Sequence, residues 1–255
     1  MSEVVNRAGR LRSGNLDVLL CDADGNLFPS EEPAFDASAA VTNQFLADFG
    51  VNRRFTPSEL RQAAVGRNFR STALALAEAY GFEVGMSDLE RYVAEERRAV
   101  VAHLRRELTP NPDVQRPLIE LARRVRLTIV SSSALVRLDA CLHAAGLAEL
   151  FPPEVRFSAE DSLPVATSKP DPAVYSHAGR MLGVAGGEAL AVEDAPAGVE
   201  SARRAGFPVV GNLVFVPPEE RTQRAEELLA AGASSIVESW YELQDALYRA
   251  PAANC

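Results

Sequence analysis

Cysteine, lysine and long apolar runs are all scarce in this 255-residue sequence. The three cysteines, Cys21, Cys141 and Cys255, are odd in number and show no framework spacing, so they predict reduced thiols in a cytoplasm. No apolar run approaches the roughly 20 residues of a membrane-spanning helix. Residues 1–15 contain arginines but no apolar stretch, so they predict a flexible N-terminal arm and not a signal peptide.

Basic residues are fewer than acidic ones. Lys and Arg total 26 against 35 Asp and Glu, which gives a formal net charge of −9. This balance disfavours a protein that coats nucleic acid or binds an anionic membrane. Only one of the 26 basic residues, Lys169, is a lysine. It is either a remnant of compositional drift or a position that needs a compact point charge, which a planar guanidinium does not supply.

What the sequence does contain is a series of short apolar runs separated by helical patterns. The runs are continuously apolar, which is typical of strands covered on both faces. Their alternation with helices predicts parallel pairing with right-handed crossovers, and therefore an α/β fold with a doubly wound parallel sheet. The predicted strands are 16–22, 126–131, 155–158, 189–193, 208–211 and 235–237, and the helices between them include 134–145, 172–182, 197–205 and 219–231.

About a hundred residues after the first strand interrupt this alternation and contain only helical patterns, near 37–49, 57–65, 69–80 and 88–107. Thr56 with Glu59, and Ser87 with Glu90, have the spacing of capping boxes. Prolines mark both ends of the stretch. We therefore predict an all-helical cap domain, residues 32–112, inserted as a lid into an α/β catalytic core formed by residues 16–31 and 113–255.

Four short polar segments lie at the ends of predicted strands or helices of the core. In an open parallel sheet, ligands bind beyond the carboxyl ends of the strands, so we expect these segments to lie together. They are Asp22–Asn26 after the first strand, Ser131–Ser133 after the second, Ser168–Asp171 before the helix at 172, and Glu193–Gly198 after the fourth strand.

The residue types in these segments suit phosphoryl transfer. Asp22, Asp24, Glu193 and Asp194 supply the oxygen ligands that Mg²⁺ prefers. Asp22, ionised at neutral pH, is a candidate nucleophile, and the cation with Lys169 would offset its repulsion from a phosphate dianion. Asp24, two residues further along an extended chain, is placed to protonate the leaving oxygen and later to deprotonate a water molecule. The alternative is a set of turn-forming acidic residues, which the agreement of four segments disfavours.

These four segments, in this order, resemble the haloacid dehalogenase superfamily, in its phosphatase and β-phosphoglucomutase-like branch with a helical cap. The resemblance extends from Leu16 to about Leu247. It implies that Asp22 is a nucleophile that forms an aspartyl-phosphate, and that Asp24 is the general acid/base. It also implies Ser131 as a phosphate-binding hydroxyl, Lys169 as a clamp on phosphate and nucleophile, and Asp194 with Glu193 as Mg²⁺ ligands beside Asp22 and the backbone carbonyl of Asp24.

Several positions depart from the family pattern. Asn26 stands where the phosphatases usually have threonine, and Ser168 where a glycine usually precedes the lysine. Asp24 is a carboxylate where the dehalogenases have tyrosine and the phosphonate hydrolases have alanine, which disfavours both of those chemistries. Ala34 stands where the sugar phosphomutases usually have histidine, which favours a hydrolase over a mutase.

Substrate contacts beyond the phosphate are harder to assign from sequence. Arg67 and Arg70, between two predicted cap helices, are candidates for contact with the leaving group, although an arginine is more often solvated. Ser132 is a candidate substrate contact, with a helix cap as the alternative, and the same alternative applies to Ser131.

The sequence thus predicts a cytoplasmic, Mg²⁺-dependent phosphatase for a small phosphate monoester, such as a sugar phosphate or a related metabolite. A β-phosphoglucomutase-like phosphomutase is the first alternative. A non-catalytic protein that binds a phosphorylated metabolite is the second, and the presence of both Asp22 and Asp24 argues against it. We expect neither nucleic acid nor membrane as a partner. The identity of the substrate and the oligomeric state stay open.

Overall fold

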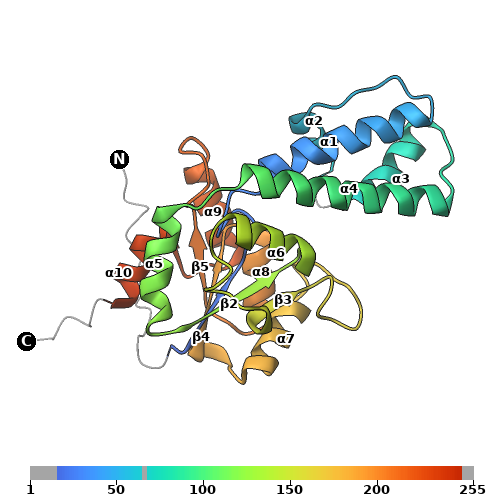
Figure 1. Cartoon of the computed structure of the whole chain (residues 1–255). Coiled ribbons are helices and arrows are strands. Elements are labelled where there is room, and N and C mark those ends of the chain that lie inside the picture. The colour runs from blue at the N-terminus through green and yellow to red at the C-terminus, as the bar shows by residue number, and fades with distance from the viewer. Residues whose placement is uncertain (1–15, 65–67, 249–255) are drawn as a thin grey trace, which may run out of the picture. The chain divides into compact units, whose positions relative to one another are not determined.

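The computed structural model describes residues 16–64 and 68–248, so the predicted N-terminal arm lies outside the described residues. A parallel sheet forms the centre of one part of the chain (Figure 1). Its six strands have the order β3-β2-β1-β4-β5-β6. Because the strand order reverses between β1 and β4, the predicted doubly wound α/β fold is confirmed. The strands lie within two residues of their predicted bounds: β1 Val18–Cys21, β2 Arg126–Ser131, β3 Arg156–Ser158, β4 Ala189–Glu193, β5 Val209–Asn212 and β6 Ser235–Val237.

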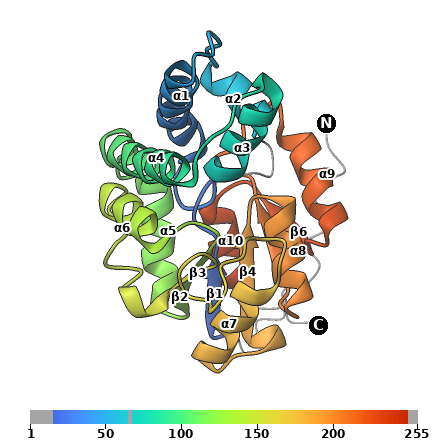
Figure 2. The same ribbon diagram turned by 90° about the vertical axis from the view of Figure 1, so that its right-hand side faces the viewer.

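Helices cover both faces of this sheet (Figures 1 and 2). They are α5 Pro112–Ala122, α6 Leu135–Ala144, α7 Ala173–Leu182, α8 Pro196–Arg204, α9 Arg221–Ala231 and α10 Trp240–Tyr248. Val18 and Leu20 of β1 belong to a buried cluster that includes Val174 of α7 and Val199 of α8. Leu19, which points to the opposite face, is also fully buried, and α5 packs against β2 and α10. The continuous apolarity of β1 is explained by this two-sided cover.

Residues 30–108 form a second compact unit, made of helices. The helices are α1 Glu31–Asp48, α2 Pro57–Ala63, α3 Phe69–Tyr80 and α4 Met86–Glu107. α1 packs along α4 around an aromatic cluster, in which the rings of Phe45 and Tyr92 meet edge to face at 5.1 Å between centroids. Phe49 and Phe82 stack at 4.8 Å. The unit begins at residue 30 and ends at residue 108, where the sequence predicts 32 and 112.

One of the two capping boxes predicted for this unit is present in the structure. The backbone N–H of Thr56 donates to Glu59 Oε2 at 2.8 Å and the N–H of Glu59 donates to Thr56 Oγ1 at 3.2 Å, which is the predicted capping box. The second prediction is wrong, because α4 begins at Met86 with Gly85 as its N-cap and Ser87 lies inside the first turn. No helix in the described part of the chain combines the length and apolarity that crossing a bilayer requires.

Candidate active site

The parallel pairing of β1 with β4 sets two acidic residues side by side. Cys21 is in register with Val192, and the backbone N–H of Asp22 donates to the carbonyl of Val192 at 3.0 Å. Asp22 and Glu193 therefore leave neighbouring strand ends, and both are buried. Asp194 follows directly and is buried as well.

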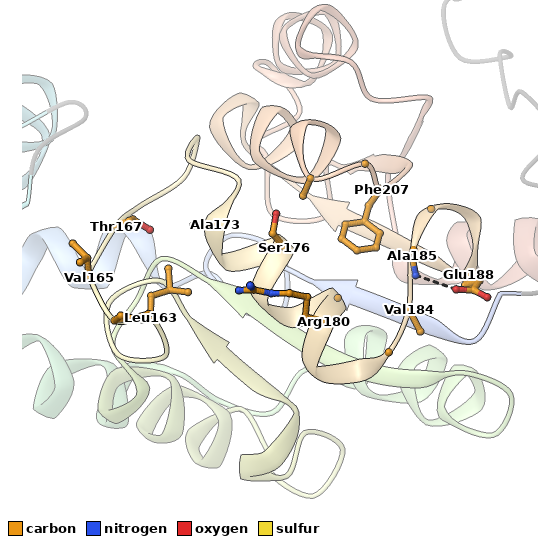
Figure 3. Close-up of a pocket in the computed structure, with 16 residues that line it drawn as sticks. Leu163, Val165, Thr167, Ala173, Ser176, Arg180, Val184, Ala185, Glu188 and Phe207 are labelled. Carbon is orange, nitrogen blue, oxygen red and sulfur yellow. Dashed lines mark hydrogen bonds between the residues drawn. The ribbon is translucent and has the colours of Figure 1, made fainter.

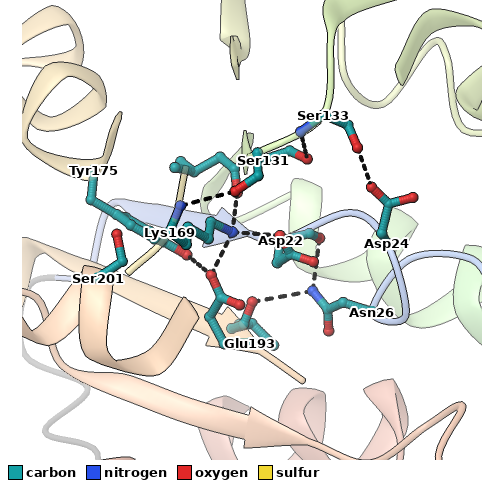
Figure 4. Close-up of polar contacts among 12 residues, drawn as sticks. Asp22, Asp24, Asn26, Ser131, Ser133, Lys169, Tyr175, Glu193 and Ser201 are labelled. Carbon is teal, nitrogen blue, oxygen red and sulfur yellow. Dashed lines mark hydrogen bonds and ion pairs between the residues drawn. The ribbon is translucent and has the colours of Figure 1, made fainter. Parts of the chain in front are cut away.

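Lys169 joins these carboxylates from the segment that precedes α7 (Figure 4). Its Nζ donates to Asp22 Oδ1 and, at 2.7 Å, to Glu193 Oε1. The carbonyl of Val130, at the end of β2, accepts a third hydrogen bond at 2.7 Å. The Lys169 side chain is only 7% exposed, so the chain's one lysine is not a solvated surface residue.

The electrostatics of this cluster favour an additional positive charge. Burial raises the pKa of Asp22 to about 8, although the Lys169 ammonium acts in the opposite direction. Burial also disfavours the charged form of Lys169, but the carboxylates of Asp22 and Glu193 outweigh burial and hold the lysine pKa above its ordinary value. A bound cation would favour the ionised Asp22 that a nucleophile requires.

Three carboxylates are close enough to share one metal ion. Asp22, Glu193 and Asp194 each offer an oxygen within 4.8 Å of the others. Buried oxygen donors with only one ammonium among them fit a divalent cation. Gly25 makes room for this arrangement, since its φ is +76° and an added Cβ would lie 2.2 Å from Asp194 Oδ2. A residue with a side chain at position 25 would displace the Asp194 carboxylate.

The Glu193 carboxylate is fixed by its surroundings. The Tyr175 hydroxyl, buried in α7, donates to the same Oε1 that accepts from Lys169. On the other side, an added Cβ at Gly198 in α8 would lie 1.8 Å from Glu193 Oε2. Neither Tyr175 nor the closeness of Gly198 was anticipated from sequence, because both depend on how helices pack against the end of β4.

The serines at the end of β2 and directly after it support Lys169 and each other. Ser132 Oγ accepts the backbone N–H of Lys169 at 3.1 Å, so Ser132 links the end of β2 to the lysine-bearing segment. Ser131 is buried, and its Oγ accepts the backbone N–H of Ser133 at 3.1 Å. The phosphate and substrate contacts predicted for Ser131 and Ser132 stay predictions.

The Asp24 carboxylate turns toward the segment after β2 and not toward Lys169 (Figure 4). Ser133 Oγ donates to Asp24 Oδ2 at 2.6 Å, and the Arg137 guanidinium donates to Asp24 Oδ1 at 2.8 Å. Sequence analysis missed Arg137. Arg137 lies in the first turn of α6, the helix that follows these serines, and no motif in the sequence marks it.

Asn26, a departure from the family pattern, holds the loop that follows β1. Its Nδ2 donates to the carbonyls of Asp22 at 2.8 Å and Val192 at 3.2 Å. Its Oδ1 accepts from Asn212 Nδ2, at the end of β5, at 2.8 Å. The side chain therefore connects the backbone of Asp22 to two neighbouring strands, and Asn212 is a second residue that the sequence analysis missed.

The two arginines predicted to contact substrate are not part of this cluster. Arg67 lies outside the described residues. Arg70, in the helical unit, forms a two-pronged ion pair with Glu90, with Nη2 and Oε2 2.7 Å apart. Its contact with a leaving group stays a prediction.

An open hollow of about 970 Å³ lies elsewhere on the α/β unit (Figure 3). Its walls are mostly aliphatic, with Leu163 and Val165 on one side, Arg180 of α7 in the middle and Phe207 opposite. None of the carboxylates at the strand ends lines it. We assign no chemistry to this hollow.

Comparison with known proteins identifies the family. The sequence model of the haloacid dehalogenase-like hydrolases matches residues 16–206, which include the segments that carry Asp22, Ser131, Lys169 and Glu193. The chain belongs to that family. The resemblance drawn from the sequence motifs is thereby confirmed.

Curated relatives of this haloacid dehalogenase-like hydrolase are named as phosphatases. The validoxylamine A 7′-phosphate phosphatase of Streptomyces hygroscopicus subsp. limoneus is 39% identical over 106 residues, which are 42% of this chain and 47% of that protein. The match thus spans about half of that relative's length. A phosphorylated carbohydrates phosphatase of Thermotoga maritima is 25% identical over 223 residues, covering 87% of this chain and 94% of that protein.

Solved structures agree on the fold of this haloacid dehalogenase-like hydrolase. CbbY from Rhodobacter sphaeroides, in complex with phosphate, superposes with a TM-score of 0.69 at 23% identity. The superposition covers 89% of this chain and 96% of CbbY. At this identity the likeness concerns the arrangement of helices and strands, and the chemistry has to be argued from the side chains.

Proposed function

We propose that this chain is a Mg²⁺-dependent phosphatase that hydrolyses a small phosphate monoester through an aspartyl-phosphate on Asp22. The observation that carries the proposal is the contact of the Lys169 ammonium with Asp22 and Glu193 inside a buried group of carboxylates. Positive charge beside a nucleophilic carboxylate offsets its repulsion from a phosphate dianion and stabilises the transferring phosphoryl group.

The reaction has two steps. In the first, an oxygen of Asp22 attacks phosphorus, the bond to the ester oxygen breaks, and Asp24 gives its proton to the leaving oxygen. In the second, Asp24 takes a proton from water, whose oxygen attacks phosphorus and releases inorganic phosphate, which regenerates Asp22. Mg²⁺, when bound, supplies Lewis-acid stabilisation of the phosphoryl charge. We assign its ligation to the Asp22, Glu193 and Asp194 carboxylates and the Asp24 carbonyl.

The substrate we propose is a phosphorylated sugar or a related small metabolite in the cytoplasm. The names of the relatives support this class, since one acts on phosphorylated carbohydrates and another on validoxylamine A 7′-phosphate. Ser131 and Ser132 would contact the phosphate. The helical unit would act as the cap that selects the leaving group, with Arg67 and Arg70 as its candidate contacts.

The test compares the wild-type chain with Asp22→Asn on an aryl phosphate and a panel of sugar phosphates in the presence of Mg²⁺. We expect the wild type to release phosphate and Asp22→Asn to lose at least about a thousandfold of the rate, because an amide is not a nucleophile. Acid-quenched wild type should carry one phosphoryl group on the peptide that contains Asp22.

A matched control is Asp245→Asn, an exposed aspartate of α10, which should keep full activity. Equal phosphate release by the wild type and Asp22→Asn would overturn the nucleophile assignment. A saturable isomerisation of a sugar phosphate with little free phosphate would identify a mutase. The absence of any turnover across the panel would favour the non-catalytic binder.

A further inference from the structure

The general acid/base assigned to this reaction, Asp24, has a hydrogen-bond donor on each of its carboxylate oxygens. Arg137 donates to Oδ1 at 2.8 Å and Ser133 donates to Oδ2 at 2.6 Å. Both donors come from the segment that follows β2, whereas Asp24 follows β1, the neighbouring strand. The carboxylate plane is therefore set by a part of the chain more than a hundred residues away.

This ion pair is neither a surface contact nor a sealed one. The Arg137 side chain is 26% exposed and that of Asp24 is 21% exposed. At this depth the pair is shielded from the bulk water that weakens exposed salt bridges, yet a ligand can still reach the carboxylate. Arg137 lies in the first turn of α6, a regular helix on the sheet, so the guanidinium starts from a fixed backbone.

The two donors differ in what they permit. A guanidinium can only donate hydrogen bonds. The carboxylate oxygen that accepts from Arg137 therefore cannot carry a proton that points toward the guanidinium. A serine hydroxyl donates to a carboxylate oxygen and, after rotation, accepts from a protonated one. Of the two Asp24 oxygens, Oδ2 beside Ser133 is thus the one whose surroundings accommodate the proton that a general acid must hold.

We propose that Arg137 is a positioning residue for the phosphatase reaction: with Ser133 it orients Asp24 so that Oδ2 is the oxygen that exchanges a proton with the leaving group. The proposal rests on the proposed function. The proton passes from Oδ2 to the ester oxygen as its bond to phosphorus breaks, and Oδ1 stays with Arg137. Without Arg137, Oδ1 loses this hydrogen bond, and the direction in which Oδ2 faces the leaving group is less tightly constrained.

Esters that differ in leaving group test this role. An alkyl phosphate, such as a sugar phosphate, needs a proton on its leaving oxygen, whereas an aryl phosphate with an acidic phenol leaves without one. For Arg137→Met we expect kcat/KM to fall about 10- to 100-fold on the alkyl ester and less than about threefold on the aryl ester. Arg137→Lys should recover part of the alkyl activity, because its ammonium supplies one donor without the planar fork.

Ser133→Ala is a second variant, for which we also expect a larger loss of kcat/KM on the alkyl ester than on the aryl ester. It tests the proposal if Arg137→Met does not fold. Arg116→Met, an exposed arginine of α5, is the matched control and should behave as the wild type on both esters. Equal losses on both esters would show a structural role and overturn the proposal. A rise in KM confined to substrates with a second anionic group would also overturn it, by making Arg137 a substrate ligand. If the wild type hydrolyses neither ester, the proposed function fails first.

Discussion

At the scale of single residues, the lone lysine is matched to its surroundings. The Lys169 ammonium has three N–H bonds, and three oxygens accept from it, on Asp22, Glu193 and Val130. A guanidinium presents its donors in a flat fork and does not reproduce this arrangement. The presence of this one lysine is therefore better explained by a site that requires a compact charge than by compositional drift.

Replacing this lysine should cost both activity and stability. For Lys169→Arg we expect phosphate release to fall about 10²- to 10³-fold, the usual loss when one donor to a developing charge is misplaced. For Lys169→Met we also expect the free energy of unfolding to drop by about 3–5 kcal/mol, because two buried carboxylates lose their partner. The measurements are initial rates on an aryl phosphate and denaturant unfolding in metal-free buffer.

The control for this pair is Arg116→Lys, a swap at an exposed position of α5. It should change neither rate nor stability. If Lys169→Arg kept more than about a third of the wild-type rate, the requirement for a compact ammonium would be wrong.

At the scale of elements, the start of α8 leaves no space beside Glu193. Gly198→Ala would place a Cβ 1.8 Å from Glu193 Oε2, so either the helix shifts or the carboxylate turns away from Lys169 and Tyr175. We expect about 1–3 kcal/mol of destabilisation, the range for overpacking a filled interior, and a weaker response to Mg²⁺. Thermal unfolding with and without the metal measures both effects.

Gly187→Ala is the matched control, since an added Cβ there meets no atom within 4 Å. Its unfolding and its metal response should equal those of the wild type. A Gly198→Ala variant as stable and as metal-responsive as the wild type would show that Glu193 has room to adjust.

Strands were more predictable than helices in this chain. A buried parallel strand such as β1 is a short apolar run, and its residues alone mark its bounds. α1 begins at Glu31, six residues before the predicted start at 37, and carries Pro33 in its first turn, a position where proline is tolerated. α5 was not among the predicted helices, although Asn111 caps it and Pro112 opens it. Pro117 lies inside this helix, where proline is usually unfavourable.

At the scale of the whole molecule, the sequence predicted which polar segments lie together at the ends of the strands, but not which residues support them. Asp22 and Glu193 could be found because each lies at the carboxyl end of a strand whose direction the fold determines. Lys169 could be found because it is the one lysine in the chain. Tyr175, Asn212 and Arg137 reach the site through helix packing or long side chains, so their spacing along the chain carries little signal. Asn26 was noticed only as a departure from the family pattern, and its hydrogen bonds required the structure.

The charge of the whole chain adds to that of the site. The net charge is −9, and the site groups three buried carboxylates, Asp22, Glu193 and Asp194, around one ammonium. A ligand that binds only the folded state stabilises it by RT ln(1 + [L]/Kd), which is about 2.7 kcal/mol when the ligand is at a hundred times its Kd. Mg²⁺ should therefore stabilise the α/β unit even without substrate.

We expect saturating Mg²⁺ to raise the melting temperature of the α/β unit by about 5–10 °C, since 1 kcal/mol corresponds to about 2–4 °C for domains of 150–250 residues. Asp194→Asn should remove most of this shift, because the amide has nearly the same volume as the carboxylate but lacks the negative charge that binds the cation. Asp245→Asn and Na⁺ at equal ionic strength are the controls, which separate site binding from general screening of the acidic chain. The same rise in Asp194→Asn as in the wild type would mean that Mg²⁺ binds elsewhere on the chain.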